Sequence, residues 1–234
     1  MLGTLPQTTR PTSCPYQVGA PIELADLLAL PPDGNDYGRD EDGRLVIMSP
    51  DDQKKHNNPI NRFVAILIRE IGPSCVARSE PSVAFAKIRH LRGQLLRESF
   101  LGPRAVQPDV AVWGCEPEYV EGPTGLTWYS PKDLLLVVEI LSPGTWHSDL
   151  GIGEADDVDR KRTYLESGVP EYWILNSAVD DPACSVPLRG ALLLSAAPGG
   201  QAWEEIPIEG GKLCSRAVPG LALDLESFWR DCRI

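Results

Sequence analysis

The stretch LLLVVEIL, residues 134–141, places one carboxylate, Glu139, inside a run of large apolar side chains. A run this apolar and β-branched is typical of a strand in the middle of a sheet, covered on both faces. Burying an unpaired carboxylate costs several kcal/mol or keeps the group protonated. The sequence therefore predicts a central strand over residues 134–141 and a partner that stabilises the charge of Glu139.

The composition is that of a globular protein with a sizeable core. Of the 234 residues, 42% are hydrophobic and 24% are charged, which suits one large domain or two small ones. No stretch approaches the roughly 20 apolar residues of a membrane span, and the first residues lack the apolar core of a signal peptide. The six cysteines lie far apart, which predicts reduced thiols in a cytoplasmic protein.

The net charge of −11 argues against a large nucleic-acid surface that is held by charge alone. A nuclease is not excluded, because carboxylates that bind metal ions also make a chain more acidic. Basic residues gather in KIRHLRGQLLR, residues 87–97. This segment is either a solvated strand pair or loop, or a strip that contacts phosphates.

The order of the expected elements indicates one α/β domain around a mixed sheet. Residues 1–40 are expected to form a loosely structured arm with a short helix. A longer helix is expected to start at Asn58 as N-cap, with Pro59 at its first position, and to end at Gly72. We also expect strands at 43–50, 74–86, 107–113 and 170–176, a helix at 157–168, loops at 114–133 and 142–157, and a late hairpin followed by a closing element.

Two strands each carry a carboxylate near an end. Alternate side chains of a strand share a face, so Glu139 points the same way as Val137 and Leu141. Glu139 also lies close to the C-terminal end of its strand, where sheets of α/β proteins open onto ligand crevices. Asp109 follows Pro108 at the start of another strand. Asp109 either joins Glu139 in a site or caps a strand or turn.

A lysine in the predicted helix 157–168 offers a counter-charge. Val158 and Lys161 are three residues apart and fall on one apolar stripe. We therefore expect Lys161 on the sheet-facing side, near Glu139, and Arg160 on the solvated side. A divalent cation would stabilise Glu139 still better. Alternatively, Lys161 forms an ordinary helix salt bridge with Asp157, four residues earlier.

Two carboxylates and a lysine suit metal-dependent phosphodiester hydrolysis. Hard carboxylate oxygens hold Mg²⁺ or Mn²⁺, and the metal polarises the phosphate and lowers the pKa of a bound water. A lysine ammonium positions or deprotonates the attacking water and offsets developing negative charge.

Four motifs in order carry a resemblance to a known family: Pro108-Asp109; Glu139-x-Leu141-Ser142-Pro143; Asp157 with Lys161 and Tyr164; and Gly168-Val169-Pro170-Glu171-Tyr172-Trp173. The sequence resembles the Uma-type family of putative restriction endonucleases, within the PD-(D/E)XK nuclease superfamily. The resemblance covers most of the chain from about residue 36 onward, including DGRLVIMSP (42–50) and SRAVPGLALDLESFW (215–229).

The resemblance implies an α/β (α+β) fold that is restriction-endonuclease-like: a mixed β-sheet flanked by helices, with additional antiparallel strands, in a single domain over residues 41–234. It implies a Mg²⁺- or Mn²⁺-dependent endonuclease with DNA as substrate. Asp109, Glu139 and Ile140 would be the metal ligands. The catalytic residues would be Asp109, Glu139, Lys161 and His56.

Some of these residues also have ordinary structural interpretations. His56 either caps or packs at the start of the first long helix, or lines the cleft as a helper base or phosphate contact. Tyr164 and Trp173 are expected in the core between helix and sheet. His147 and Asp149, in the long loop, either approach a substrate or are ordinary polar residues of a mobile loop.

A second class of function fits the same residues. A binding or assembly module could keep the nuclease fold without catalysis, with Asp109, Glu139 and Lys161 as a buried structural ion network. The acidic net charge favours this alternative, because it offers little attraction for DNA. For an enzyme that cuts both strands we expect a homodimer, because symmetric dimers are the commonest homo-oligomers.

Overall fold

The computed structural model describes residues 20–23, 26, 30, 36–39, 45–48, 50–86, 88–89, 104–121, 127–153 and 158–232. The chain divides into two compact units, residues 1–53 and 54–234. The first unit contains β1 (Asp36–Arg39) and β2 (Leu45–Met48), which pair antiparallel. The strand expected at 43–50 is thus β2. Most of the expected arm and its short helix, and most of the basic segment 87–97, lie outside the described residues.

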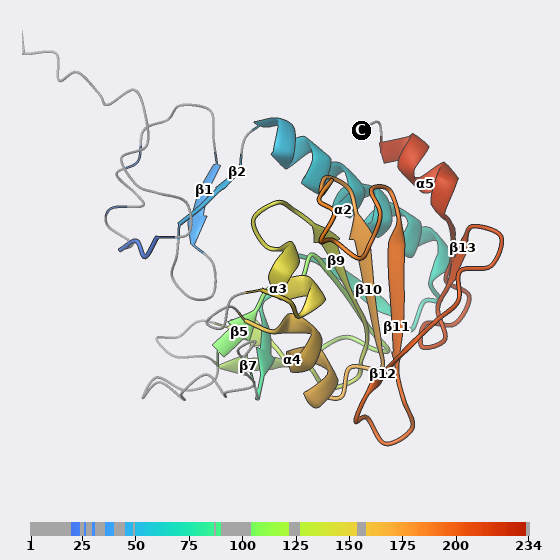
Figure 1. The fold of residues 1–234 in the computed structure, drawn as a ribbon. Coiled ribbons are helices and arrows are strands. Elements are labelled where there is room, and N and C mark those ends of the chain that lie inside the picture. Colours follow the sequence, from blue (N-terminus) through green and yellow to red (C-terminus); the bar gives the residue numbers. More distant parts are fainter. Residues whose placement is uncertain are drawn as a thin grey trace, which may run out of the picture. The chain divides into compact units, whose positions relative to one another are not determined.

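The second unit is built around a six-stranded mixed sheet with the strand order β12-β11-β10-β9-β6-β3 (Figure 1). In its centre, β9 runs parallel to β10 and antiparallel to β6. The bounds are β3 (Val76–Ser79), β6 (Val110–Trp113), β9 (Leu134–Leu141), β10 (Glu171–Asn176), β11 (Ala191–Ala196) and β12 (Trp203–Glu205). The predicted central strand is confirmed with the same bounds, and so is the mixed α+β fold class.

Two smaller sheets accompany the central one. The first has the order β5-β4-β8-β7, with β4 (Val83–Phe85), β5 (Arg104–Val106), β7 (Tyr119–Glu121) and β8 (Thr127–Tyr129). The second pairs β13 (Lys212–Cys214) with β14 (Ala222–Asp224). Two expectations are therefore wrong. The segment 74–86 forms two strands in different sheets, because Glu80 adopts a φ of 48° and Pro81 follows it, and the loop expected at 114–133 contains β7 and β8.

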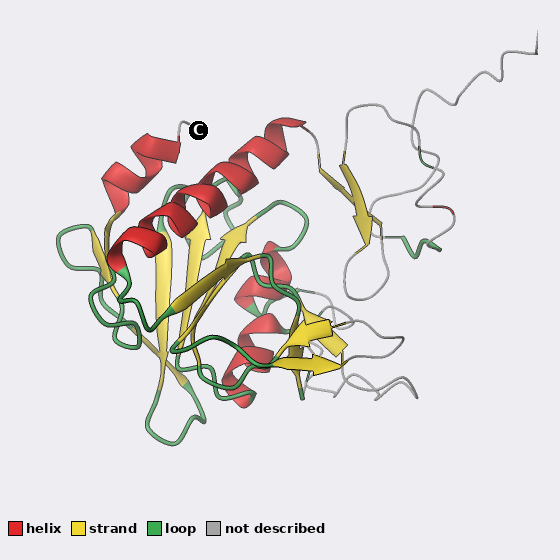
Figure 2. Ribbon diagram, turned by 180° about the vertical axis from the view of Figure 1, so that it is seen from behind, coloured by secondary structure: helices red, strands yellow, loops and turns green. Residues whose placement is uncertain are grey.

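Helices cover both faces of the central sheet (Figures 1 and 2). One face packs on α2 (Pro50–Glu70) and α5 (Leu225–Cys232), and the other on α3 (Trp146–Leu150) and α4 (Arg160–Glu166). In β9, Val138 faces the first core and Val137 the second, which explains why the strand is apolar throughout. None of the helices in the described ranges has the length and apolarity needed to cross a bilayer.

The first long helix begins earlier than expected. It starts at Pro50, so Asn58 is not its N-cap and Pro59 lies inside it. Pro50 takes the first position, where a missing N–H is tolerated. The side chain of Asn58 instead donates from Nδ2 to the carbonyl oxygen of Cys232 in α5, at 3.1 Å. The apolar side of the helix packs on the sheet: Phe63 is fully buried there, together with Ile60 and Leu67.

A second buried carboxylate fastens the C-terminal region to the sheet. Glu171 in β10 is fully buried. It accepts hydrogen bonds from Trp173 Nε1 at 2.8 Å, Ser215 Oγ at 2.6 Å and the backbone N–H of Ala217 at 2.8 Å. Glu171 therefore holds the segment between β13 and β14 against β10.

Replacing Glu171 by alanine should lower the free energy of unfolding by about 3 kcal/mol, because the substitution leaves several buried donors without an acceptor. Urea unfolding followed by tryptophan fluorescence measures the change. Glu209→Ala, at an exposed position, is the matched control and should change stability by no more than about 0.5 kcal/mol. Equal stability of the two variants would show that Glu171 does not hold this segment.

Candidate active site

Asp109 and Glu139 meet where β6 begins, near the C-terminal end of β9. Val110 of β6 is paired with Val138 of β9 in the antiparallel ladder, which brings Asp109, the residue before Val110, next to Glu139, the residue after Val138. The N–H of Asp109 donates to Glu139 Oε2 at 3.2 Å, and the N–H of Ile140 donates to Asp109 Oδ2 at 2.6 Å. Asp109 therefore caps β9, as its structural interpretation expects, and it also lies beside Glu139.

Glu139 has two partners from α4. Tyr164 donates its hydroxyl to Glu139 Oε1 at 2.5 Å, and Arg160 Nη1 lies 2.9 Å from the same oxygen. Glu139 is only 1% exposed. Burial raises the pKa of this carboxyl well above its usual range, the negative charges of Asp109 and Asp149 add to the rise, and Arg160 opposes it. The sequence predicts a partner that stabilises Glu139, and the structure provides two: the guanidinium of Arg160 and the phenol of Tyr164.

The expectation that Lys161 faces the carboxylates and Arg160 faces solvent is wrong. The side chain of Arg160 is 10% exposed and pairs with Glu139. Lys161 is half-buried and lines a surface cavity of about 480 Å³, together with Trp203, Leu192 and other residues of the β11–β12 side. Within the described ranges, no ion pair joins Lys161 to either carboxylate. Asp157, its alternative partner, lies outside those ranges.

The reason lies in where α4 begins. The helix starts at Arg160, after the N-cap Asp159, whose side chain accepts from the N–H of Arg162 at 2.8 Å. Val158 precedes the helix, so a helical stripe cannot be counted from it. The buried positions of α4 are Arg160, Thr163 and Tyr164. Counting back four residues from Tyr164 would have found Arg160.

Asp149 also belongs to the site, although the sequence suggested a mobile loop. It lies in α3, is 1% exposed, and its Oδ1 is 3.3 Å from Arg160 Nη1. Tyr172 donates its hydroxyl to the backbone carbonyl of Asp149 at 3.0 Å. His147 of the same helix is exposed and stacks on Trp146. Asp149 belongs to no sequence motif that would have revealed its contact with Arg160.

His56 and Ile140 both contact Asp109. His56 lies inside α2, not before it, and its Nε2 is 3.0 Å from Asp109 Oδ1. Burial alone would lower the pKa of His56, but the charge and hydrogen bond of Asp109, with more distant Asp149 and Glu80, raise it overall. Ile140 offers its N–H to Asp109, while its side chain is buried in the core against α2.

The negative charge of the cluster would suit a divalent cation. Three carboxylates, Asp109, Glu139 and Asp149, face one guanidinium, Arg160, and one imidazole, His56. Even with a protonated imidazole, one negative charge stays unbalanced when all three acids are ionised. In the described part of the chain, no three His, Cys, Asp or Glu side chains are arranged as a ready-made metal site. Mg²⁺ needs only one or two carboxylates, because it keeps several waters.

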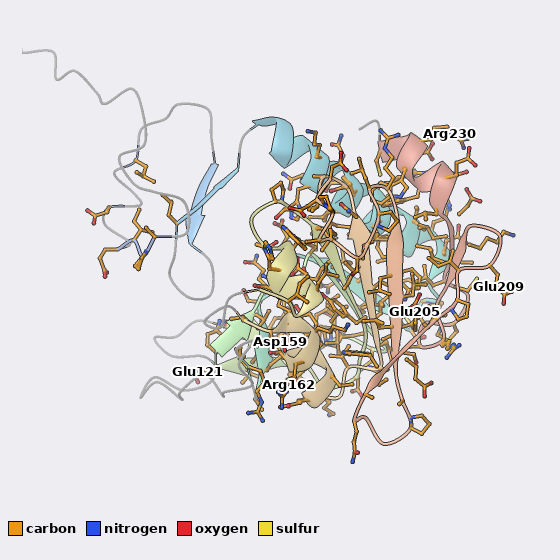
Figure 3. The ribbon with its side chains drawn as sticks, viewed as in Figure 1. Glu121, Asp159, Arg162, Glu205, Glu209 and Arg230 are labelled. Carbon is orange, nitrogen blue, oxygen red and sulfur yellow. The ribbon has the colours of Figure 1, made fainter. Side chains whose placement is uncertain are left out.

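Arg160→Gln should lower the free energy of unfolding by about 3 kcal/mol, because it leaves two buried carboxylates without their guanidinium. Arg162→Gln on the outer side of the same helix (Figure 3), whose side chain is 47% exposed, should cost no more than about 0.5 kcal/mol. Thermal and urea unfolding in EDTA measure both variants. Equal losses would mean that Arg160 does not neutralise the cluster.

Comparison with known proteins places this geometry in a family. The sequence matches the Uma2 family, described as "Putative restriction endonuclease", over residues 24–226. A crystal structure of a putative nuclease belonging to DUF820 from Anabaena variabilis aligns with a TM-score of 0.50 at 16% identity, covering 91% of this chain and 99% of that one. This likeness shows a shared fold. No curated protein matches the sequence. Because the family match spans most of its length, the chain belongs to the Uma2 family of putative restriction endonucleases.

Proposed function

We propose that the chain is a divalent-metal-dependent endonuclease that hydrolyses phosphodiester bonds of DNA. One observation carries the proposal: Asp109, just before β6, and Glu139, in the neighbouring strand β9, meet beside the buried guanidinium of Arg160. Membership of a family described as restriction endonucleases and a fold shared with a nuclease support it.

Asp109 and Glu139 would hold Mg²⁺ or Mn²⁺, with Ile140 contributing its backbone. The bound cation would polarise the phosphate and lower the pKa of a water molecule. Burial raises the pKa of Glu139 and thereby favours its protonated form. A cation beside it would have the opposite effect and favour the ionised carboxylate that a ligand requires. The N–H groups of Asp109 and Ile140 keep the two carboxylates at fixed positions across the strand pair.

Arg160 takes the cationic role that the sequence suggested for Lys161. A guanidinium keeps its proton in proteins, so it cannot serve as the base that activates water. It can form charge-assisted hydrogen bonds to a phosphate and stabilise the negative charge that develops there. His56, whose Nε2 contacts Asp109, would be a second phosphate contact.

We also propose a substrate, an oligomeric state and a location. DNA as the substrate follows from the family description, and a homodimer would supply two sites for cutting both strands. A cytoplasmic location rests on the cysteine pattern. The cysteines in the described ranges are free thiols: Cys75, Cys115, Cys184, Cys214 and Cys232.

A second candidate is a binding or assembly module without catalysis. It is favoured by the way protein groups already engage both carboxylates. Asp109 meets His56 and the N–H of Ile140, and Glu139 meets Tyr164, Arg160 and the N–H of Asp109. This is the buried ion network of the alternative hypothesis, with Arg160 in the place of Lys161.

A plasmid-cleavage assay with Mg²⁺ or Mn²⁺ tests the proposed function. Glu139→Gln and Asp109→Asn should each lower the cleavage rate at least about 100-fold, and Arg160→Gln at least about tenfold, because each removes electrostatic stabilisation of the reacting phosphate. Lys161→Ala should stay within about twofold of the original chain, because the half-buried Lys161 lines a cavity away from the two carboxylates and substitutions away from such special sites have small effects.

The assay also separates the two candidates. Cleavage that persists in Glu139→Gln at the original rate would come from a contaminating nuclease. Absence of cleavage by the original chain with either metal, together with a stable fold in EDTA, would favour the non-catalytic module. Loss of activity in Lys161→Ala with normal activity in Arg160→Gln would contradict the assignment of Arg160.

A further inference from the structure

Arg160 contacts two buried carboxylates through one nitrogen. Its Nη1 is 2.9 Å from Glu139 Oε1 and 3.3 Å from Asp149 Oδ1. Glu139 is a proposed metal ligand, whereas Asp149 has no role in the proposed chemistry. Because Nη1 is shared, a shift of the guanidinium toward one carboxylate lengthens its contact with the other.

The guanidinium of Arg160 and a divalent cation compete for Glu139. Glu139 Oε1 accepts from the Tyr164 hydroxyl and faces Arg160, while Oε2 accepts from the N–H of Asp109. Two positive charges that share one carboxylate repel each other, strongly so where water is excluded. A cation that binds both Asp109 and Glu139 is therefore opposed by Arg160 for as long as the guanidinium stays on Oε1.

Asp149 is held in place by its own helix and by neighbouring strands. Its N–H donates to the carbonyl oxygen of Thr145 at 3.2 Å, and Thr145 Oγ1 donates to its Oδ2 at 3.3 Å. Thr145 Oγ1 is also 3.0 Å from Ser142 Oγ, and Tyr172 donates to the carbonyl oxygen of Asp149 at 3.0 Å. Ser142 directly follows β9, so Asp149 is fixed relative to the end of that strand, with Oδ2 engaged by Thr145 and Oδ1 toward the guanidinium.

We infer that Asp149 is a positioning residue that retains Arg160 when a divalent cation binds Asp109 and Glu139. The inference rests on the proposed function. With Asp149 present, the guanidinium gives up Glu139 Oε1, keeps Asp149 Oδ1, and stays in the site to contact the phosphate. Without Asp149, Glu139 is the carboxylate that remains among the described ion-pair partners of the guanidinium, which then opposes the cation.

Calorimetric titration of the full chain with MnCl₂, without DNA, tests the inference in four proteins: the original chain, Asp149→Asn, Arg160→Gln and the double variant. Asp149→Asn should weaken Mn²⁺ binding at least about tenfold, in the range of supporting residues at metal sites. Arg160→Gln should bind at least as tightly as the original chain, and Asp149→Asn should cause no further weakening in that background. Asp180→Asn, at an exposed position, is the charge-matched control and should stay within about twofold.

Three outcomes would overturn the proposals. Equal weakening by Asp149→Asn in both backgrounds would show that Asp149 acts through its charge alone and not through Arg160. Unchanged Mn²⁺ binding in Asp149→Asn would show that it does not retain the guanidinium. No Mn²⁺ binding by the original chain at millimolar concentration would overturn the proposed metal site itself, which the first two outcomes leave intact.

A second measurement needs no variant and serves if Asp149→Asn does not fold. In crystals of the original chain soaked in MnCl₂, Arg160 Nη1 should keep its contact with Asp149 Oδ1 and lie more than about 4 Å, beyond ion-pair distance, from Glu139 Oε1. Mn²⁺ on Glu139 with an unchanged contact between Arg160 and Glu139 would contradict the inference.

Discussion

The buried charge of Glu139 is the constraint on which the site and its surroundings depend. A carboxylate in the centre of a sheet, 1% exposed, destabilises the fold by several kcal/mol unless other groups compensate it. Three compensating groups come from two parts of the chain: the residue before β6 supplies the N–H of Asp109, and α4 supplies both the hydroxyl of Tyr164 and the guanidinium of Arg160. Helix α3 then supplies Asp149 as the second partner of that guanidinium. The packing of these elements on β9 therefore follows from a polar requirement as well as from apolar burial.

The parts of this arrangement that depend on periodicity could be predicted from the sequence. Strand 134–141 was predicted from its continuous apolar run, and a sheet covered by helices on both faces needs such a run. Alternation along the strands put Glu139 and Asp109 on comparable positions, and the antiparallel register brings them together. Tyr164 and Trp173 were expected in the core, and both are fully buried. In each case the signal is contained in a few neighbouring residues.

The parts that depend on contacts between distant residues could not be predicted. The start of α4 is set by the strand-like segment before it: the N–H of Asp159 donates to the carbonyl oxygen of Arg89 at 2.7 Å, and the N–H of Arg89 donates to Thr163 Oγ1 at 3.0 Å. Because of this pairing, α4 starts a few residues later than predicted, and Arg160, not Lys161, lies on the buried side of the helix. Likewise, the side chain of Asn58 donates to a carbonyl oxygen in α5, 174 residues away along the chain. The local preference of Asn58 for the start of a helix therefore has no effect.

Charge connects the site to the choice between the two functions. A chain with a net charge of −11 attracts DNA weakly, and the carboxylates of Asp109, Glu139 and Asp149 repel a phosphate at short range, where screening by salt is least effective. Arg160 alone does not reverse the sign of this cluster. A divalent cation would reverse it, because it would add two positive charges beside the guanidinium. In the proposed enzyme, metal binding and phosphate binding would then be coupled, because the negative charge that repels DNA without a cation would also attract the cation. A non-catalytic module has no use for this negative excess, since a single carboxylate paired with Arg160 would satisfy the buried charge.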